Sequence, residues 1–207
     1  MKKYSNFIFD VGANDGSDGL ALACKNKEYF IHAFEANPYL IKKIKSLKKK
    51  LETRIGKSIN NYKIHNLAVG DKKKIATFNI SSNHRVSSLN KLSKNIDKSW
   101  PGYKEKIFKV IKKIKVRVIT LDDFMKKNKI KIIDYLHVDT QGSDIMVLKG
   151  LKSNINSVLE GKIEAATSKE KAAYINNHTI ADVKKFFSKT NIKITSITKI
   201  EHISDKG

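Results

Sequence analysis

The feature that most constrains the fold is a largely apolar segment, residues 7–11, that runs into a turn with two glycines, Gly12-Ala-Asn-Asp-Gly16. A second apolar segment, residues 29–34, ends directly before Glu35. Glu35 follows Gly16 by 19 residues (35 − 16), close to the ~20 residues that separate a ligand-binding turn from the ribose-binding acid of a nucleoside pocket. The two segments therefore predict neighbouring parallel strands with a nucleoside site at their carboxyl ends.

The turn limits which nucleoside ligand can bind. The three-glycine fingerprint of a pyrophosphate site is absent, and the sequence has no Gly-x-x-x-x-Gly-Lys-Ser/Thr loop for a triphosphate. Gly12 and Gly16 allow close approach of the main chain to a ligand, and Asn14 tolerates a left-handed conformation. The N-terminus of the next helix suits a carboxylate. The pattern favours adenosine joined to a small zwitterion, as in S-adenosylmethionine; the alternative for the turn alone is an ordinary strand-to-helix connection.

Length and composition predict one soluble domain that spans residues 1–207. The chain has 207 residues, 40% of them hydrophobic, and only two prolines, so a full core is expected and no linker is indicated. Cys24 is the single cysteine, which excludes an internal disulfide and favours a small buried side chain. Neither a secretory signal nor a membrane span is indicated, so a cytoplasmic location is expected.

The charge balance is strongly basic, with 42 lysines and arginines against 20 acids and a formal net charge of +22. Arginine occurs only at Arg54, Arg85 and Arg117, which leaves 39 lysines (42 − 3). Because nucleic-acid sites draw on the planar fork of arginine, a solvated lysine surface is the favoured interpretation. A dedicated polyanion site is the alternative, and a basic surface would favour acceptors that carry phosphate.

Strand and helix patterns alternate along the chain, which predicts an open, doubly wound, mostly parallel sheet with helices on both faces. We expect helices after Ser17 as N-cap, after Pro38, over residues 121–125 and 143–148, after the capping box Thr179-Ile-Ala-Asp182, and over 107–114, where apolar residues share one helical face. We expect strands over residues 6–11, 29–34, 63–69, 74–80, 116–119, 132–138, 159–165, 192–197 and 200–203.

The chain resembles the FkbM family of S-adenosylmethionine-dependent methyltransferases. The ordered segments that carry the resemblance are Phe9-Asp-Val-Gly-Ala-Asn-Asp-Gly16, Phe34-Glu-Ala-Asn37, Asn66-Leu-Ala-Val-Gly70, Ser87-Ser-Leu89, Val118-Ile-Thr-Leu-Asp122 and Leu136-His-Val-Asp-Thr-Gln-Gly142. The resemblance covers most of the chain up to Gly150 and thins beyond it. It implies a class I methyltransferase fold, Rossmann-like, and methyl transfer to a hydroxyl, often on a sugar or a secondary metabolite.

The resemblance also implies roles for individual residues. The methionine part of the cofactor would be surrounded by Asp10, Gly12, Ala13, Asn14 and Gly16. Glu35 would hold the ribose, and the adenine side would be formed by Asn37, Asn66 and Ala68. Asp139 would face the methyl group and the substrate. The chain departs from the family's usual Lys-Ile-Asp-Val-Glu-Gly: Gln141 replaces an acid, and His137 replaces a lysine and is interpreted as a hydrogen-bonded sheet residue.

Methyl transfer to an alcohol needs alignment and one general base. Asp139 is the candidate base, with Thr140 as a second catalytic residue; the alternative for Asp139 is to bind the amino group of the cofactor. His84, Ser88 and Gln141 are the candidate substrate-binding residues. An oxygen cage for a metal is too weakly supported by two carboxylates and an amide, so no metal site is predicted.

The sequence thus favours an S-adenosylmethionine-dependent O-methyltransferase that acts on a sugar, a nucleotide-linked sugar or a similar small polyol, with S-adenosylhomocysteine as product. Residues 81–115 are expected to cover the acceptor pocket, since a long loop in a compact domain is usually functional. Two alternatives remain open: an RNA-directed methyltransferase that uses the basic surface, and a non-catalytic cofactor- or partner-binding module, suggested by Gln141. The sequence gives no indication of the oligomeric state.

Overall fold

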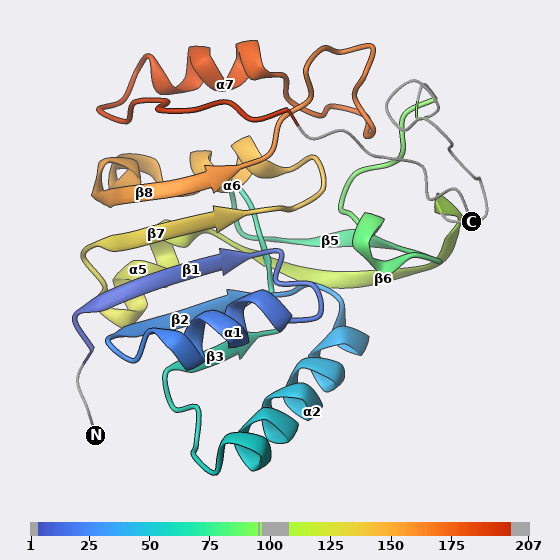
Figure 1. Ribbon diagram of the computed structural model, residues 1–207. Coiled ribbons are helices and arrows are strands. Elements are labelled where there is room, and N and C mark those ends of the chain that lie inside the picture. Colours follow the sequence, from blue (N-terminus) through green and yellow to red (C-terminus); the bar gives the residue numbers. More distant parts are fainter. Residues whose placement is uncertain (1–3, 95, 97–107, 200–207) are drawn as a thin grey trace.

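The fold is built on a five-stranded parallel sheet, as the computed structural model shows (Figure 1). The structure describes residues 4–94, 96 and 108–199. The strand order is β3-β2-β1-β7-β8, so the chain starts in the middle of the sheet and builds outward in both directions. The strands are β1 (Asn6–Val11), β2 (Tyr29–Phe34), β3 (Tyr62–His65), β7 (Ile133–Val138) and β8 (Val158–Ile163). The predicted doubly wound α/β fold is confirmed.

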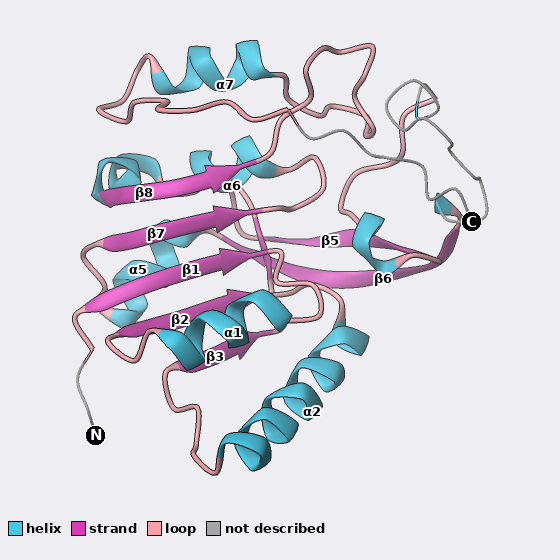
Figure 2. Cartoon of the chain, in the orientation of Figure 1, coloured by secondary structure: helices cyan, strands magenta, loops and turns pink. Residues whose placement is uncertain are grey.

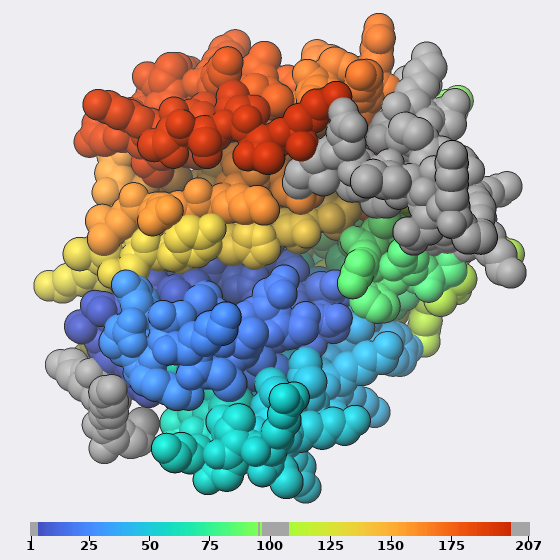
Figure 3. Space-filling model, viewed as in Figure 1, coloured from blue at the N-terminus to red at the C-terminus, as the bar shows by residue number. Residues whose placement is uncertain are grey.

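Helices cover both faces of this sheet. On one face, α1 (Ser17–Lys25) and α2 (Pro38–Ile55) pack through a core that includes Leu20, Ile31 and Ile44. On the other, α5 (Leu121–Asn128) and α6 (Asp144–Lys149) pack through a core that includes Phe9, Phe34 and Met125. The last helix, α7 (Ile180–Phe187), lies beyond the β8 edge, and its residues cover that edge in Figure 3. The helix predicted after Pro38 and the capping box predicted for α7 are both confirmed.

A second sheet of three strands lies beside the carboxyl ends of the first sheet (Figure 1). Its order is β4-β6-β5, with β4 (Ala68–Val69) parallel and β5 (Lys74–Ser81) antiparallel to β6 (Val110–Ile119). The predicted single strand over residues 63–69 is therefore wrong, because the chain leaves one sheet after His65 and enters the other at Ala68. The predicted extra strand over residues 74–80 is confirmed.

The predicted helix over residues 107–114 is also wrong, because residues 110–119 form one long strand. Its inner face carries Ile114, Val116 and Val118, which pack with Phe78 of β5. The alternate side chains Lys113 and Lys115 are exposed. This alternation of buried and exposed side chains has the period of two that a half-buried strand requires. The short strand predicted over residues 116–119 is therefore part of a longer strand. Residue 107 lies outside the described residues.

Two further expectations do not hold. Ser17 is not the N-cap of α1: Gly16 takes that position in a left-handed conformation, and the Ser17 hydroxyl donates to Asp15 Oδ1 at 2.7 Å. Residues 192–197 form no strand; the chain after α7 is a loop that follows the helix back (Figure 2). The strand predicted over 200–203 lies outside the described residues. In the part of the chain that the structure describes, no helix has the length and apolarity to cross a bilayer.

Candidate active site

A cavity of about 890 Å³ lies at the carboxyl ends of β1, β2, β7 and β8, where it also meets the second sheet. Small-molecule sites enclose roughly 300–1,000 Å³, so the cavity has room for a nucleoside cofactor and an acceptor together. The sequence-predicted residues that line it are Asp10, Gly12, Ala13, Asn14, Glu35, Ala68, His84, Asp139, Thr140 and Gln141. Four others do not line it: Gly16, Asn37, Asn66 and Ser88.

The turn after β1 is fixed by its two neighbouring strands. The N–H groups of Gly12 and Ala13 both donate to the Phe34 carbonyl at the end of β2, at 2.9 and 3.0 Å. Gly12 has a φ of +93°, and a Cβ placed there would lie 1.8 Å from the Asp139 carbonyl oxygen. Glycine is therefore required because the β7–α6 connection passes directly over it, a reason that the sequence alone did not indicate. Asn14 is left-handed as expected, with a φ of 51°.

Three of the predicted residues that do not line the cavity instead hold the neighbouring turn and helix starts in place. Gly16 packs against Ile44 and Tyr62 as the N-cap of α1. Asn37 caps α2 by accepting from the Tyr39 N–H at 3.1 Å. The Asn66 amide donates to the carbonyls of Glu35 and Ala36, at 3.0 and 3.1 Å, and so fixes the end of β2. Their contacts are those of positioning residues.

Glu35 is a buried carboxylate of the cavity, held by backbone hydrogen bonds. It is 6% exposed, and each oxygen accepts one backbone N–H: Oε1 from Asn37 at 2.7 Å and Oε2 from Asn14 at 2.8 Å. Each oxygen keeps a further lone pair for a ligand hydroxyl. Burial raises the pKa of Glu35 to about 7, and the two N–H donors oppose that rise. A buried acid with a perturbed pKa in a cavity is a candidate functional group.

Asp139, directly after β7, is held by a series of hydrogen bonds between side chains. Its Oδ1 accepts from the Gln141 amide at 2.6 Å, and the Gln141 oxygen lies 2.9 Å from the Tyr174 hydroxyl. Burial raises the pKa of Asp139, which suits a base that works near neutral pH. The Thr140 hydroxyl donates to Asp144 Oδ2 at 3.1 Å, so Thr140 is tied to a second carboxylate.

His137 stands between the two central strands, as predicted for a hydrogen-bonded sheet histidine. Its Nδ1 lies 3.0 Å from Asp10 Oδ1. The hydrogen bond to Asp10 raises the pKa of His137 against the opposing effect of burial. The pair therefore orients Asp10, and both residues line the cavity, where His137 also interacts electrostatically with Asp139.

The segment after β5 returns to the strand ends and forms a wall of the cavity. It contains a 3-10 turn, η1 (His84–Val86), whose His84 Nδ1 lies 2.7 Å from Asn14 Oδ1. Figure 3 shows the segment in green against the blue residues near the end of β1. Buried Ser88 does not face the cavity; its hydroxyl donates to the Gln141 carbonyl at 2.7 Å. Residues 95 and 97–107 of the expected covering stretch lie outside the described residues.

Sequence reasoning missed several residues of the cavity wall. Tyr174 is the main one: it is 4% exposed, and its hydroxyl lies 3.0 Å from the Val86 carbonyl. It belongs to no local motif, and only a contact between segments far apart in the sequence places it there. Phe78 was within reach of prediction, because it lies on the inner face of the alternating strand β5. Glu164 follows the fifth strand of the sheet and shared the strand-end position of the predicted acids.

The sheet order defines a doubly wound α/β fold, and an acid at the end of β2 is typical of such folds that bind nucleoside cofactors. The family model for the methyltransferase FkbM domain matches residues 10–190, and the chain therefore belongs to the FkbM methyltransferase family. The resemblance predicted from the sequence is confirmed. Family membership supports a methyl-transfer function and implies a methyl donor, for which the family usually takes S-adenosylmethionine.

A solved structure matches part of the chain. It is the crystal structure of methyltransferase FkbM from Methylobacillus flagellatus KT, with 13% sequence identity and a TM-score of 0.44. The match covers 75% of this chain and 32% of that chain, so this chain corresponds to about a third of that protein's length. No curated protein matches the chain. Among the described residues, no group of three or more His, Cys, Asp or Glu is placed to hold a metal ion.

Proposed function

We propose that the protein is an S-adenosylmethionine-dependent O-methyltransferase whose acceptor is a sugar or a similar small polyol. The observation that carries the proposal is Glu35, a buried carboxylate at the β2 end with a free lone pair on each oxygen and a cavity of about 890 Å³ before it. Family membership supports the methyl transfer. The hydroxyl acceptor and its sugar nature are the further step that the proposal makes.

The residues of the cavity fit the proposed cofactor. Glu35 offers two acceptor oxygens side by side, the arrangement that two neighbouring ribose hydroxyls require. Next to it, Leu67, Ala68 and Phe78 give an apolar wall for a flat base. The acids on the β1 side match the positive charges of the donor. S-adenosylmethionine supplies an activated methyl group on a sulfonium, so the protein needs to add only alignment, exclusion of water and removal of one proton.

Asp139 is the proposed base for the acceptor hydroxyl. Its carboxylate accepts from the side-chain amide of Gln141 and also from the Gln141 backbone, and a carboxylate with about four lone-pair sites can accept the hydroxyl proton as well. The contact also holds the carboxylate in one orientation, because Gln141 is itself held by Tyr174. Thr140 is proposed as a positioning residue, since its hydroxyl is engaged with Asp144. His84 and Gln141 remain proposed contacts of the acceptor, and Ser88 is proposed to hold the wall in place.

We propose that the described residues of the stretch 81–115 that precede β6 cover the acceptor pocket. Arg85 and Ser87 of this stretch line the cavity together with His84. The backbone of the stretch is joined to β5 by mutual hydrogen bonds between Asn79 and Ser88, at 2.8 and 3.1 Å. A wall made from a returning segment encloses an acceptor and keeps water from the reacting atoms, which is what a methyl transfer needs from its protein.

Calorimetry with S-adenosylmethionine tests the proposal through Glu35→Ala. Each hydrogen bond to a charged group contributes about 1.5–3 kcal/mol, so the loss of two predicts an affinity at least roughly 100-fold weaker. Glu28→Ala is the matched control, because Glu28 is exposed and lies just before the opposite end of β2. An unchanged dissociation constant in a folded Glu35→Ala protein would refute the ribose assignment. A mass-spectrometric search for methylated sugars then tests the acceptor class.

A further inference from the structure

The charge of the cavity is opposite to the charge of the chain. Of the 20 acids in the sequence, seven line the cavity, whereas only two of the 42 lysines and arginines do. The two cations are Lys171 and Arg85, both exposed. The seven acids are Asp10, Asp15, Asp18, Glu35, Asp139, Asp144 and Glu164. In a protein of net charge +22, this concentration of carboxylates selects for a ligand with positive charge.

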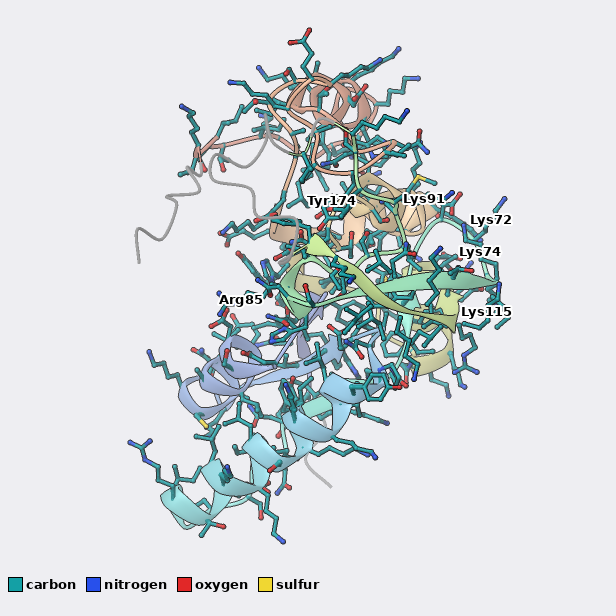
Figure 4. All side chains as sticks on the ribbon, turned by 90° about the vertical axis from the view of Figure 1, so that its right-hand side faces the viewer. Lys72, Lys74, Arg85, Lys91, Lys115 and Tyr174 are labelled. Atoms are coloured by element: carbon teal, nitrogen blue, oxygen red, sulfur yellow. The ribbon has the colours of Figure 1, made fainter. Side chains whose placement is uncertain are left out.

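The basic surface lies elsewhere. Figure 4 shows Lys72, Lys74 and Lys115 together at one margin of the molecule, apart from Arg85 at the cavity. Lys74 belongs to β5, Lys115 to β6, and Lys72 to the turn before β5. None of the three lines the cavity. A phosphate group on the acceptor would therefore enter a cavity whose lining has seven acids against Arg85 and Lys171.

The methyl donor does not account for all of this acidity. The donor carries an ammonium and a sulfonium against one carboxylate, a net charge of +1, and four of the seven acids, Asp10, Asp15, Asp18 and Glu35, lie on its proposed side. Three acids remain at the other end: Asp139 after β7, Asp144 at the start of α6, and Glu164 after β8. By strand order, Glu164 is three steps from Glu35 across the sheet, roughly 14 Å at ~4.8 Å a step.

Two of these acids have an environment that a cation would improve. Asp144 is 3% exposed, and its contacts are the Thr140 hydroxyl at 3.1 Å and the Glu164 N–H at 3.5 Å. Burial, and after it the charge of Asp139, raise the pKa of Asp144 to about 7. Glu164 lines the cavity, and no hydrogen bond or ion pair of its carboxylate is found among the described residues; burial and the charge of Asp139 raise its pKa, and the charges of Lys162 and His137 oppose that rise. The described residues offer no group of three or more His, Cys, Asp or Glu placed to hold a metal ion, so we consider an organic cation.

We infer that the acceptor is an amine-bearing polyol, such as an amino sugar, whose ammonium group lies between Asp144 and Glu164 while its hydroxyl meets Asp139. The inference rests on the proposed function and narrows its substrate class. An ammonium has three N–H donors, which matches two carboxylates on neighbouring elements. The same geometry excludes a sugar phosphate in this orientation, because its charge would face three acids.

The test is a set of NMR titrations of the full chain saturated with S-adenosylhomocysteine at pH 7. The probes are glucosamine, glucose and glucose 6-phosphate, which differ in charge on one sugar skeleton. We expect glucosamine to bind at least 10-fold more tightly than glucose, and glucose 6-phosphate to bind no more tightly than glucose. Glu164→Gln should reduce glucosamine affinity at least fivefold. Glu160→Gln is the matched control, an exposed acid of β8 outside the cavity, and should change nothing.

The outcomes separate the two proposals. Equal binding of the three sugars, no binding, or a preference for glucose 6-phosphate in the protein that has bound S-adenosylhomocysteine overturns the amine inference and leaves the methyltransferase proposal standing. A protein that binds neither S-adenosylhomocysteine nor S-adenosylmethionine contradicts the proposed function, and the amine inference with it. An equal loss of glucosamine affinity in Glu164→Gln and Glu160→Gln also overturns the inference, because a general change in surface charge would then explain it.

Discussion

Replacing His32 with phenylalanine should make the stability of the protein less sensitive to acid. His32 lies on β2 and is 6% exposed, with its Nδ1 3.0 Å from His65 Nε2. The ring lies among aromatic neighbours, including Phe9 at 5.4 Å and Phe124 at 5.0 Å between centroids. Burial, followed by the charges of His65 and Lys63, lowers the pKa of His32 from 6.5 to about 3. The site thus requires a neutral ring, and phenylalanine supplies one of similar shape.

The magnitude follows from the difference between the two pKa values. Because the folded pKa of His32 is below the unfolded value, the unfolded chain takes up the proton first, and stability falls as the pH drops below 6.5. Each pH unit in the window from 6.5 to about 3 costs about 1.4 kcal/mol. Between pH 7.5 and pH 5 the loss due to His32 is therefore about 2 kcal/mol, and it depends almost entirely on the unfolded value, since pH 5 is well above the folded one.

Urea unfolding at pH 7.5 and pH 5 measures this loss. The free energy of unfolding of His32→Phe should fall by about 2 kcal/mol less than that of the wild type over this interval. His137→Gln is a control of opposite sign: the pKa of His137 is raised by Asp10, so its contribution is present at low pH and is lost as the pH rises. An equal loss of stability in wild type and His32→Phe would refute the assignment of a buried neutral imidazole.

Two further predictions concern the cavity. Gly12→Ala should lose about 3 kcal/mol or more in urea unfolding, since it combines a left-handed conformation with a Cβ 1.8 Å from the Asp139 carbonyl; Gly56→Ala, left-handed but with nothing within 4 Å, should lose only about 1 kcal/mol, and similar losses in both would remove the steric argument. Asp139→Asn should lower kcat about 100-fold or more with cofactor affinity unchanged by calorimetry, because the Gln141 amide can still donate to the retained oxygen. Full turnover in that variant would exclude Asp139 as the base.

Local sequence patterns made the part of the sheet formed by β1 and β2 predictable. The strand before Gly12, the strand before Glu35, and the Asn37-Pro38 start of α2 are each marked by residues within a few positions of one another. Their turn and cap requirements act over short distances, so a sequence pattern determines them. The acid at the β2 end was placed in the cavity for the same reason.

The second sheet was not predictable in this way. The isoleucine, valine and lysine residues of the segment 110–119 fit both the spacing of a helix and the alternation of a strand. The segment forms a strand because it pairs with β5; Ile114, for example, lies opposite Phe78. Tyr174 likewise reaches the cavity through contacts with Val86 and Gln141, which no local pattern encodes. For Gly12 the structure adds a reason that the sequence did not indicate, because the Asp139 carbonyl oxygen would lie 1.8 Å from a Cβ at this position.

The segment around Tyr174 has a consequence for how molecules enter and leave. Its backbone is joined to the segment after η1 at two points, Ser93 N–H to the Ala173 carbonyl at 2.9 Å and Ile175 N–H to the Lys91 carbonyl at 2.8 Å. Two stretches that are about 80 residues apart in the chain therefore behave as one cover over the strand ends. Opening on that side therefore has to move both stretches together or break these main-chain hydrogen bonds, so the rotation of a single side chain does not suffice.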